Sequence, residues 1–396
     1  MSPHRLALAL AAAFTLGVTL VVSFPTTVAA SVGAGQQHFF AQAAAWLAGE
    51  LTLPLASGFA ELVPVDDPTR GAVAYPPAPS LLALPFVAAG VPIELAARLL
   101  ALGLFVMICT TSLRLLAARG AGGPLLAAVG VTIAAGSGLW FLAAVPSSWY
   151  LAQLAGLAFG LGALLVGPRW PLLGGLLLGL ATASRLPVGL GVAILLGADL
   201  LRSATPRRSL LLALLGGLPV ALAWGALNLA RFGDPLDNGY ARIPGVMAEP
   251  WFADGIASLA YLPRSLEALL LRLPGSDGSM LVPDLGGMAV WIVAPALLLL
   301  PLALRRTRPS RTTAIAIVAT VAALLPGLLH GSWGFTQLGY RFAYDALPGF
   351  LLLALAAAPQ LDRRRALVVA TLVVGVVLNL WAYLQLGEGS YTLRGM

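Results

Sequence analysis

The sequence predicts an all-α protein that crosses a membrane about eleven times, with further helices lying at the membrane surface. Of its 396 residues, 59% are hydrophobic and only 10% are charged, whereas a soluble domain is about 45–50% apolar and about 25% charged. The mean hydropathy is +0.91. The apolar residues gather in stretches close to the ~20 residues that a spanning helix requires. The single cysteine, Cys109, excludes a disulfide scaffold within the chain.

Eleven apolar stretches define the predicted spans. They run over residues 6–26, 95–116, 122–143, 149–167, 171–184, 186–201, 209–230, 285–304, 312–330, 343–359 and 366–386. The stretch 171–184 is short and could form a broken helix with its neighbour around Arg185. The first stretch has an apolar core from Leu6 to Phe24, longer than the ~7–15 apolar residues of a secretory signal peptide. A retained span is therefore favoured, although Val28-Ala29-Ala30 resembles a cleavage site.

The arginines between these stretches predict the orientation of the chain. There are 23 arginines and no lysine, and 14 of the arginines fall in the short segments on the side of the amino terminus, with only 2 of the 16 acidic residues. Short loops rich in basic residues stay in the cytoplasm. We therefore expect a plasma (inner) membrane protein with its amino terminus inside and its carboxyl terminus outside. The net charge of +7 then reflects this bias and not a nucleic-acid-binding surface.

A single transmembrane domain over 1–396 is predicted, with two long segments outside the membrane. The first outer segment covers 31–94 and the second covers 231–284, while a shorter one covers 331–342. The inner segments are barely long enough to turn the chain. Any chemistry is therefore expected at the outer face.

Interfacial helices are predicted within the outer segments. The stretch from Gln36 to Leu47 places its apolar residues on one helical face, and the apolar run 80–92 is too short to span comfortably. A third such helix is predicted over 256–273. Tryptophans near the span ends are interpreted as interfacial anchors; they are Trp46, Trp140, Trp149 and Trp251.

Charged residues at the outer ends of spans are candidates for function, because a charge at the membrane edge is costly unless it has a partner. Arg341 and Asp345 stand four residues apart at the start of a span and could pair. Arg185 ends a short span and requires an anion. His38 is a single histidine beside aromatic residues, for which a hydrogen-bonded structural role is favoured over catalysis.

Metal and nucleotide sites have little support in the sequence. No cluster of His, Cys, Asp and Glu has the spacing of metal ligands, although Asp66-Asp67 could contribute to a divalent-cation site and otherwise forms a solvated turn. The 44 glycines are spread through the predicted spans, where small residues let helices approach closely, and form no phosphate-binding loop. Use of a cytosolic nucleotide sugar is therefore not expected.

Short motifs occur in order along nearly the whole chain. They are Gln36-Gln37-His38-Phe39, Tyr75-Pro76-Pro77-Ala78-Pro79, Ser184-Arg185-Leu186-Pro187, Asn228 with Arg231-Phe232-Gly233-Asp234-Pro235 and Gly239-Tyr240, Tyr261-Leu262-Pro263-Arg264, and Gly339-Tyr340-Arg341-Phe342 with Asp345 and Pro348. With the long first outer segment and about eleven spans, they resemble the GT-C fold of membrane-embedded C-type glycosyltransferases. The chain is most similar to a bacterial group of largely uncharacterised members.

The resemblance implies transfer of a hexosyl or pentosyl group from a polyprenyl-phosphate carrier to an envelope glycan, lipid or protein. In such enzymes a carboxylate of the first outer segment acts as general base, and basic residues hold the carrier phosphate. For the phosphate, the order of preference is Arg341, Arg185 and Arg231. Candidate sugar or acceptor contacts, by position, are Tyr340, Asp237, Tyr240 and Asp345.

This chain departs from the family pattern where many members carry the catalytic acid. It has no carboxylate from Ser31 to Gly49. Three interpretations stay open: Asp66 or Asp67 is the base, His38 is the base, or the protein binds a lipid-linked sugar without transferring it. A divalent cation is left open as a cofactor.

Two other classes of function are compatible with the sequence: a transporter or flippase for a lipid-linked solute, and a noncatalytic envelope-assembly protein. Transporters often contain internal repeats and charged helices at mid-membrane. We find no repeat between the halves, and the polar residues gather in the outer segments. The transferase is therefore favoured.

Overall fold

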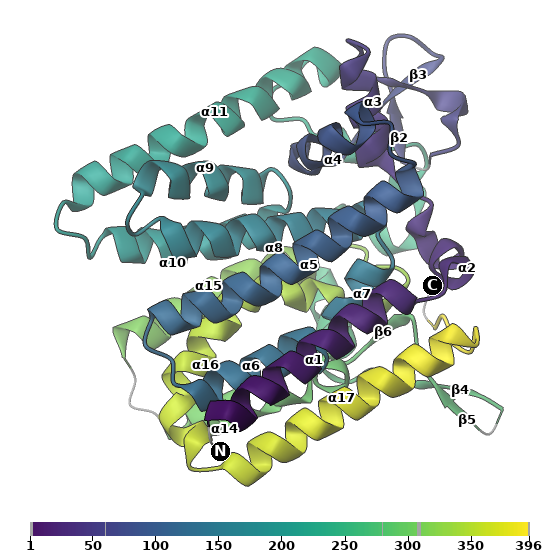
Figure 1. Cartoon of the computed structure of the whole chain (residues 1–396). Helices are drawn as coiled ribbons and strands as arrows, with labels where there is room; N and C mark the ends of the chain where they lie inside the picture. Colours follow the sequence, from purple (N-terminus) through teal and green to yellow (C-terminus); the bar gives the residue numbers. More distant parts are fainter. Residues whose placement is uncertain (1–2, 60, 279, 307–309, 395–396) are drawn as a thin grey trace.

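The computed structural model describes residues 3–59, 61–278, 280–306 and 310–394, and its long helices run side by side between two ends of the molecule (Figure 1). Within the described residues, seven helical segments are long and apolar enough to cross a membrane. They are α1 (Pro3–Ser23), α5 (Ile93–Ala118), α8 (Ser148–Val166), α11 (Pro206–Phe232), α15 (Arg311–Leu329), η8 (Arg341–Ala346) together with α16 (Leu347–Asp362), and α17 (Arg365–Gly387). The prediction of a helical, multi-pass membrane protein is confirmed.

The other predicted spans form shorter or interrupted helices. The short apolar helices are α4 (Ala78–Ala88), α6 (Gly123–Ala134), α9 (Pro171–Thr182), α10 (Leu186–Leu200), and η7 (Pro295–Leu298) with α14 (Leu299–Leu304). The stretch 122–143 breaks near Gly136 and Gly138, after which α7 (Leu139–Ala144) begins. The stretch 285–304 starts with a strand and is divided by Pro295. The number of eleven spans stays a prediction.

One end of the molecule collects the strands, most short helices and the carboxyl terminus (Figure 1). A three-stranded antiparallel sheet has the order β1-β3-β2, β4 pairs with β5, and β6 pairs in parallel with β7. The strands are β1 (Leu53–Pro54), β2 (Leu62–Pro64), β3 (Arg70–Val73), β4 (Gly275–Asp277), β5 (Met280–Val282), β6 (Gly286–Met288) and β7 (Gln337–Gly339). All of these strands except β6 lie in the three segments predicted to lie outside the membrane.

Further short helices lie within or beside these segments. The predicted surface helices 36–47, 80–92 and 256–273 correspond to α3 (His38–Leu47), α4 and α12 (Leu262–Leu270). The remaining ones are α2 (Thr26–Ala29), η1 (Ala30–Ala34), η2 (Leu55–Ser57), η3 (Tyr240–Arg242), η4 (Val246–Ala248), η5 (Pro250–Phe252), η6 (Leu259–Tyr261) and α13 (Val290–Val293).

The opposite end holds the amino terminus and the arginine-rich turns (Figure 1). Arg119 at the end of α5 pairs with Asp199 of α10, which joins two helices at this end. Arg308, one of the arginines assigned to the inner side, lies outside the described residues. The two ends therefore differ in charge as the sequence analysis expects, and the orientation in the membrane stays a prediction.

The buried core centres on α5, α7 and α8. Trp140, Phe141, Phe105 and Tyr150 are among its largest fully buried side chains. The Nε1–H of Trp140 donates to the Oδ1 of Asn379 on α17 at 2.9 Å. The interpretation of Trp140 as an interfacial anchor is therefore wrong, because its indole is enclosed by protein and its polar atom has a partner on a neighbouring helix.

Helices α9 and α11 pack closely through glycines, and this contact provides a test of the fold. A Cβ added at Gly175 would overlap the backbone carbonyl of Ala213, whereas one added at Gly197 of α10 would meet nothing within 4 Å. Gly175→Ala is therefore expected to lower the free energy of unfolding by about 1–3 kcal/mol through overpacking. Thermal unfolding of the purified protein measures this. The matched control, Gly197→Ala, is expected to be neutral or stabilising; equal losses in both variants would contradict the close packing.

Candidate functional site

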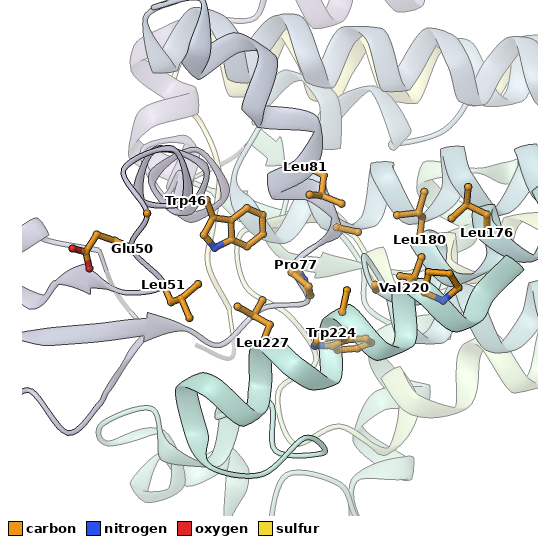
Figure 2. Close-up of a pocket in the computed structure, with 15 residues that line it drawn as sticks. Trp46, Glu50, Leu51, Pro77, Leu81, Leu176, Leu180, Val220, Trp224 and Leu227 are labelled. Atoms are coloured by element: carbon orange, nitrogen blue, oxygen red, sulfur yellow. The ribbon is translucent and has the colours of Figure 1, made fainter. Parts of the chain in front are cut away.

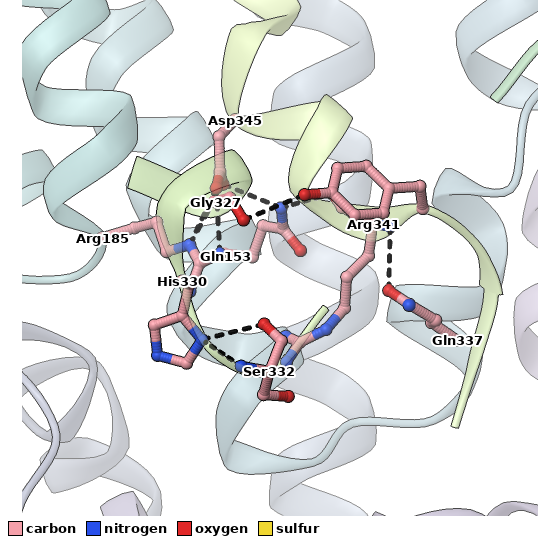
Figure 3. A network of polar contacts seen from close by, with 9 residues as sticks. Gln153, Arg185, Gly327, His330, Ser332, Gln337, Arg341 and Asp345 are labelled. Carbon is pink, nitrogen blue, oxygen red and sulfur yellow. Dashed lines mark hydrogen bonds and ion pairs between the residues drawn. The ribbon is translucent and has the colours of Figure 1, made fainter. Parts of the chain in front are cut away.

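A buried ion pair organises polar residues near the strand-bearing end of the bundle (Figure 3). Arg185, at the junction of α9 and α10, donates from Nε at 3.1 Å to both carboxylate oxygens of Asp345 and from Nη2 at 2.9 Å to Oδ2. Gln153 of α8 donates to the same carboxylate at 2.8 Å and to the backbone carbonyl of Arg341, also at 2.8 Å. Asp345 is thus fully satisfied, and Arg185 is neutralised by it.

Arg341 lies beside this pair but does not join it. The structure therefore corrects the expected pairing of Arg341 with Asp345: the carboxylate binds Arg185 instead. Residues 341–346 form a 3₁₀ turn, in which side chains three apart align and those four apart diverge. The sequence spacing suggested an α-helical pair that this local geometry does not allow.

The guanidinium of Arg341 is buried without a hydrogen-bond partner at two of its nitrogens. The side chain is 7% exposed, and its Nε and Nη1 have no partner among the described residues. Its Cζ lies 5.4 Å from the ring centre of Tyr150 and 4.9 Å from that of Phe342. The aromatic faces stabilise a cation, but they leave its N–H groups able to donate to an anion.

His330 borders the same cluster (Figure 3). It follows α15, and its Nδ1 lies 2.8 Å from the carbonyl oxygen and 3.1 Å from the backbone nitrogen of Ser332. Burial lowers the pKa of His330 to about 4, and the positive charges of Arg185, Arg341 and Arg264 act in the same direction. His330 is therefore neutral at physiological pH, so the positive charge of the cluster comes from arginine.

Glu61 is the carboxylate of the first outer segment that approaches this positive charge. Its carboxylate accepts a hydrogen bond from the Nε1–H of Trp149 at 3.1 Å. Burial raises the pKa of Glu61, and the nearby Glu249 raises it further, whereas the Trp149 hydrogen bond and the charge of Arg341 oppose the increase. A carboxylate with a raised pKa near a fixed cation has the character of an acid–base group.

Glu61 also has an unusual backbone conformation. It has φ of +62°, and Thr336 has φ of +49°; they are the two non-glycine residues of the described chain with positive φ. Both are attached to the start of α8, since Tyr150 donates its hydroxyl to the carbonyl of Thr336 just as Trp149 donates to Glu61. Left-handed conformations of this kind cost about 1–3 kcal/mol and cluster at functional sites.

His38 belongs to an aromatic group next to Glu61. Its ring centre lies 5.1 Å from those of Phe59 and Tyr75 and 6.4 Å from that of Trp149. The backbone nitrogen of His38 donates to the Oγ of Ser148 at 2.9 Å, and its Nδ1 lies 3.2 Å from the same oxygen. His38 therefore has the hydrogen-bonded role that the sequence favours, and its ring lies near the indole of Trp149, which contacts Glu61.

Asp66 and Asp67 lie apart from this group in the exposed turn between β2 and β3. The Oδ1 of Asp67 accepts hydrogen bonds from the backbone nitrogen of Thr69 at 2.9 Å and from its hydroxyl at 2.7 Å. These bonds lower the pKa of Asp67. Asp66 and Asp67 therefore form the solvated turn that the sequence allowed as the alternative to a cation site. Of the carboxylates in the first outer segment, the geometry favours Glu61 as the base.

Three other candidates have structural partners of their own. Arg231 donates to the carbonyl of Val73 at 2.9 Å and to the Oδ1 of Asn228 at 3.2 Å, and so attaches α11 to β3. Asp237 accepts from the nitrogen of Gly239 at 2.7 Å and pairs with Arg242 at 2.7 Å. Tyr340 donates its hydroxyl to the carbonyl of Gly327 at 3.0 Å. These contacts occupy most of the polar groups that were candidates for substrate, although the Nε of Arg231 has no partner among the described residues.

Tyr240 does join the site. Its ring centre lies 5.8 Å from that of His330. Burial raises the pKa of its hydroxyl, followed by the charges of Glu61 and Glu249, while Arg341 and Arg185 oppose the increase. The charges of Glu61, Glu249, Arg341 and Arg185 thus all act on this one phenol, so residues of the three outer segments lie near one another and near the start of α10.

Sequence reasoning missed Glu61, Gln153 and Glu249. No sequence motif marks Glu61, because its role depends on a backbone turn and on the indole of Trp149, which is 88 residues away in the sequence. Trp149 was interpreted as an interfacial anchor, which concealed its hydrogen bond. Within the described residues, no group of three or more His, Cys, Asp or Glu side chains is arranged to hold a metal ion.

The molecule also has an apolar groove (Figure 2). It has a volume of about 560 Å³ and is lined by residues of α3, α4, α9 and α11, among them Trp46, Leu81, Leu180 and Trp224. Ala183, which also lines it, stands two residues before Arg185. The lining thus includes a residue close in sequence to Arg185, although the residues of the charged cluster do not themselves line the groove.

Comparison with known proteins gives a limited result. No family model and no curated protein matches the chain. Two solved structures of the Archaeoglobus fulgidus oligosaccharyltransferase are similar to it. The apo form is 13% identical with a TM-score of 0.46, over 100% of this chain and 57% of that one. The enzyme called AglB, in complex with an inhibitory peptide and a dolichol-phosphate, is 14% identical with a TM-score of 0.45, over 98% and 56%.

The chain thus spans less than three-fifths of the length of those transferases. With TM-scores below 0.5, the roles of individual residues rest on the geometry of this chain alone.

Proposed function

We propose that this protein is a membrane glycosyltransferase that moves a sugar from a polyprenyl-phosphate carrier to an acceptor hydroxyl or amine at the strand-bearing, outer end of the bundle. One observation carries the proposal. The buried guanidinium of Arg341 has two nitrogens without a protein partner, and it lies within electrostatic reach of Glu61, a carboxylate of raised pKa. A fixed cation beside a base suits a reaction in which a phosphate leaves and a nucleophile loses a proton.

Arg341 binds the carrier phosphate in this proposal. Charge-assisted hydrogen bonds from guanidinium to phosphate are strong and directional. Arg185 is already neutralised by Asp345. This ion pair therefore helps to hold the cluster together and does not compete with Arg341 for the phosphate. Gln153, which contacts both Asp345 and the backbone of Arg341, is a positioning residue.

Glu61 acts as the general base. It takes the proton from the acceptor as the acceptor atom forms its bond to the anomeric carbon of the sugar. The bond between that carbon and the phosphate oxygen breaks, and the electron pair leaves with the phosphate towards Arg341. A carboxylate whose pKa is raised by burial is better matched to this task than an ordinary exposed carboxylate. The orientation of the site towards the outer leaflet follows the arginine distribution of the sequence.

The apolar groove supports a lipid carrier as donor. Its lining is hydrophobic along α4, α9 and α11, and it includes Ala183, which stands two residues before Arg185 in the sequence. A polyprenyl chain in this groove would bring its phosphate to the charged cluster while the hydrocarbon stays in the membrane. Burial of isoprenoid carbon contributes about 25 cal/mol per Å², which favours a lipid-linked over a soluble donor.

Mass spectrometry of lipid-linked sugars tests the proposal in cells. A deletion strain is compared with the same strain complemented by the intact gene. We expect one polyprenyl-phosphate sugar to accumulate and that sugar to disappear from one envelope glycan, lipid or protein. An unchanged lipid pool and unchanged glycans, in a strain without a second copy of the enzyme, would reject transfer. Uptake of a solute into liposomes with no covalent product would indicate a transporter.

A further inference from the structure

A second apolar groove lies at the other end of the bundle, among α1, α6, α17 and the end of α16. It has a volume of about 570 Å³ and is lined by branched side chains, including Leu6 of α1, Leu125 of α6 and Val373 of α17. A smaller adjoining cavity of about 90 Å³ shares Leu125 and Leu361 with it and extends towards α14. The groove is separate from the proposed donor groove, whose lining comes from α3, α4, α9 and α11.

The mouth of this groove is basic. Arg365 and Asp362 line it and form a 3.9 Å ion pair that is largely exposed. Arg363 and Arg364 complete the same turn, and the side chain of Gln360 donates to the backbone carbonyl of Arg306 at 3.4 Å, which brings a fourth arginine close. Among the described residues, no carboxylate pairs with Arg306, Arg363 or Arg364.

The start of α17 adds to the positive potential. The helix begins at Arg365, and no side chain caps its first amide groups. Free amide groups at a helix start bind anionic oxygens, such as those of a phosphate. The polar and apolar parts of the site are thus adjacent: arginines and a helix start at the mouth, and an aliphatic groove directly behind them.

We infer that this groove binds an anionic phospholipid of the surrounding leaflet, with its phosphate on the turn 363–365 and an acyl chain against α6 and α17. The charge complementarity selects the occupant. A neutral lipid would leave the arginines without a counterion, and a second protein chain would have to bring an acidic surface to the same turn. Anionic lipids are attracted to basic groups at the membrane surface and bind in basic pockets between helices.

Native mass spectrometry of the purified full-length protein tests the inference. Dioleoylphosphatidylglycerol is titrated against dioleoylphosphatidylcholine, which has the same acyl chains. We expect the anionic lipid to bind preferentially, and the double variant Arg364→Gln with Arg365→Gln to weaken its binding about tenfold or more. Asp362→Asn, which removes the one carboxylate at the mouth, is expected to strengthen binding.

Two further variants separate a site from general attraction. Val373→Trp fills the groove and is expected to reduce binding of the anionic lipid with the arginines intact. The control, Arg207→Gln with Arg208→Gln, removes the same charge at the start of α11, outside the groove lining, and is expected to leave binding unchanged. Equal binding of the two lipids, an equal loss in the control, or dimers that replace the lipid would each overturn the inference.

Discussion

Replacement of Glu61 by glutamine is expected to lower the rate of sugar transfer by about 10²–10⁴-fold, the range for loss of a general base. The amide has nearly the same shape, and its oxygen can still accept the hydrogen bond from Trp149. The negative charge and the ability to take a proton are lost. Transfer of a radiolabelled sugar from the lipid carrier by the purified variant measures the effect, with donor binding measured separately as a check that the site is intact.

The folding of this variant provides an independent check. Because the pKa of Glu61 is raised, the folded protein favours the neutral carboxyl group. This contribution to stability is present below the ordinary carboxylate pKa and is lost as the pH rises through the raised value. At neutral pH, Glu61→Gln is therefore expected to be at least as stable as the parent. A variant that is inactive because it unfolds would contradict the proposed role.

The matched controls are Asp66→Asn and Asp67→Asn. Both residues are exposed in the β2–β3 turn, and Asp67 contacts Thr69 of the same turn. Each variant is expected to retain most of its activity. Loss of activity in either, with Glu61→Gln unaffected, would return the base to the acidic pair that the sequence favoured. The acidic limb of the rate–pH profile is expected above the ordinary pKa of glutamate and to be absent in Glu61→Gln.

Arg341→Gln is expected to raise the KM for the lipid-linked donor about 10- to 100-fold, as for loss of a hydrogen bond between charged groups. The KM for the acceptor is expected to change little. The substitution breaks no ion pair, since Asp345 is bound to Arg185, and it removes a buried charge with two unpartnered nitrogens. We therefore expect no loss of thermal stability.

Arg231→Gln is the control for this prediction. Arg231 is also buried, but it donates to the carbonyl of Val73 and to Asn228. Its loss is expected to lower stability by releasing β3 from α11, without a selective effect on the donor. If Arg231→Gln raised the donor KM and Arg341→Gln did not, the phosphate site would lie at the end of α11 instead.

The sequence was sufficient to predict the membrane class and the location of the polar segments. The long apolar stretches of the sequence correspond to the helices α1, α5, α8, α11, α15, α16 and α17. Their length is predictable because bilayer thickness sets the length of a spanning helix. The breaks within apolar stretches were not predicted, since hydropathy does not distinguish one long helix from two short ones. The helix break after α6 and the strand β6 depend on glycine, proline and tertiary hydrogen bonds, which an average over a window conceals.

The cost of a charge in the membrane selected three candidate residues, whose roles in a site stay predictions. Arg185, Arg341 and Asp345 were identified on that basis, and they meet in the structure. Their pairing was predicted incorrectly, because the sequence did not distinguish a 3₁₀ turn from an α-helix at 341–346. Glu61 could not be found, since its importance comes from Trp149 and Arg341, both distant in sequence.

The start of α8 holds two loops from opposite parts of the chain, through Trp149 to Glu61 and through Tyr150 to Thr336. Two neighbouring residues of one helix therefore fix the distance between Glu61, the proposed base, and the loop that leads into Arg341. These two segments cannot swing apart unless contacts at a single helical turn are broken. In the proposed reaction the lipid donor enters the groove between α4, α9 and α11, whose lining includes neither Trp149 nor Tyr150. In the proposed reaction, entry of the donor and alignment of the reacting groups therefore depend on different helices. The mouth of the groove can open while Glu61 and Arg341 keep their relative positions.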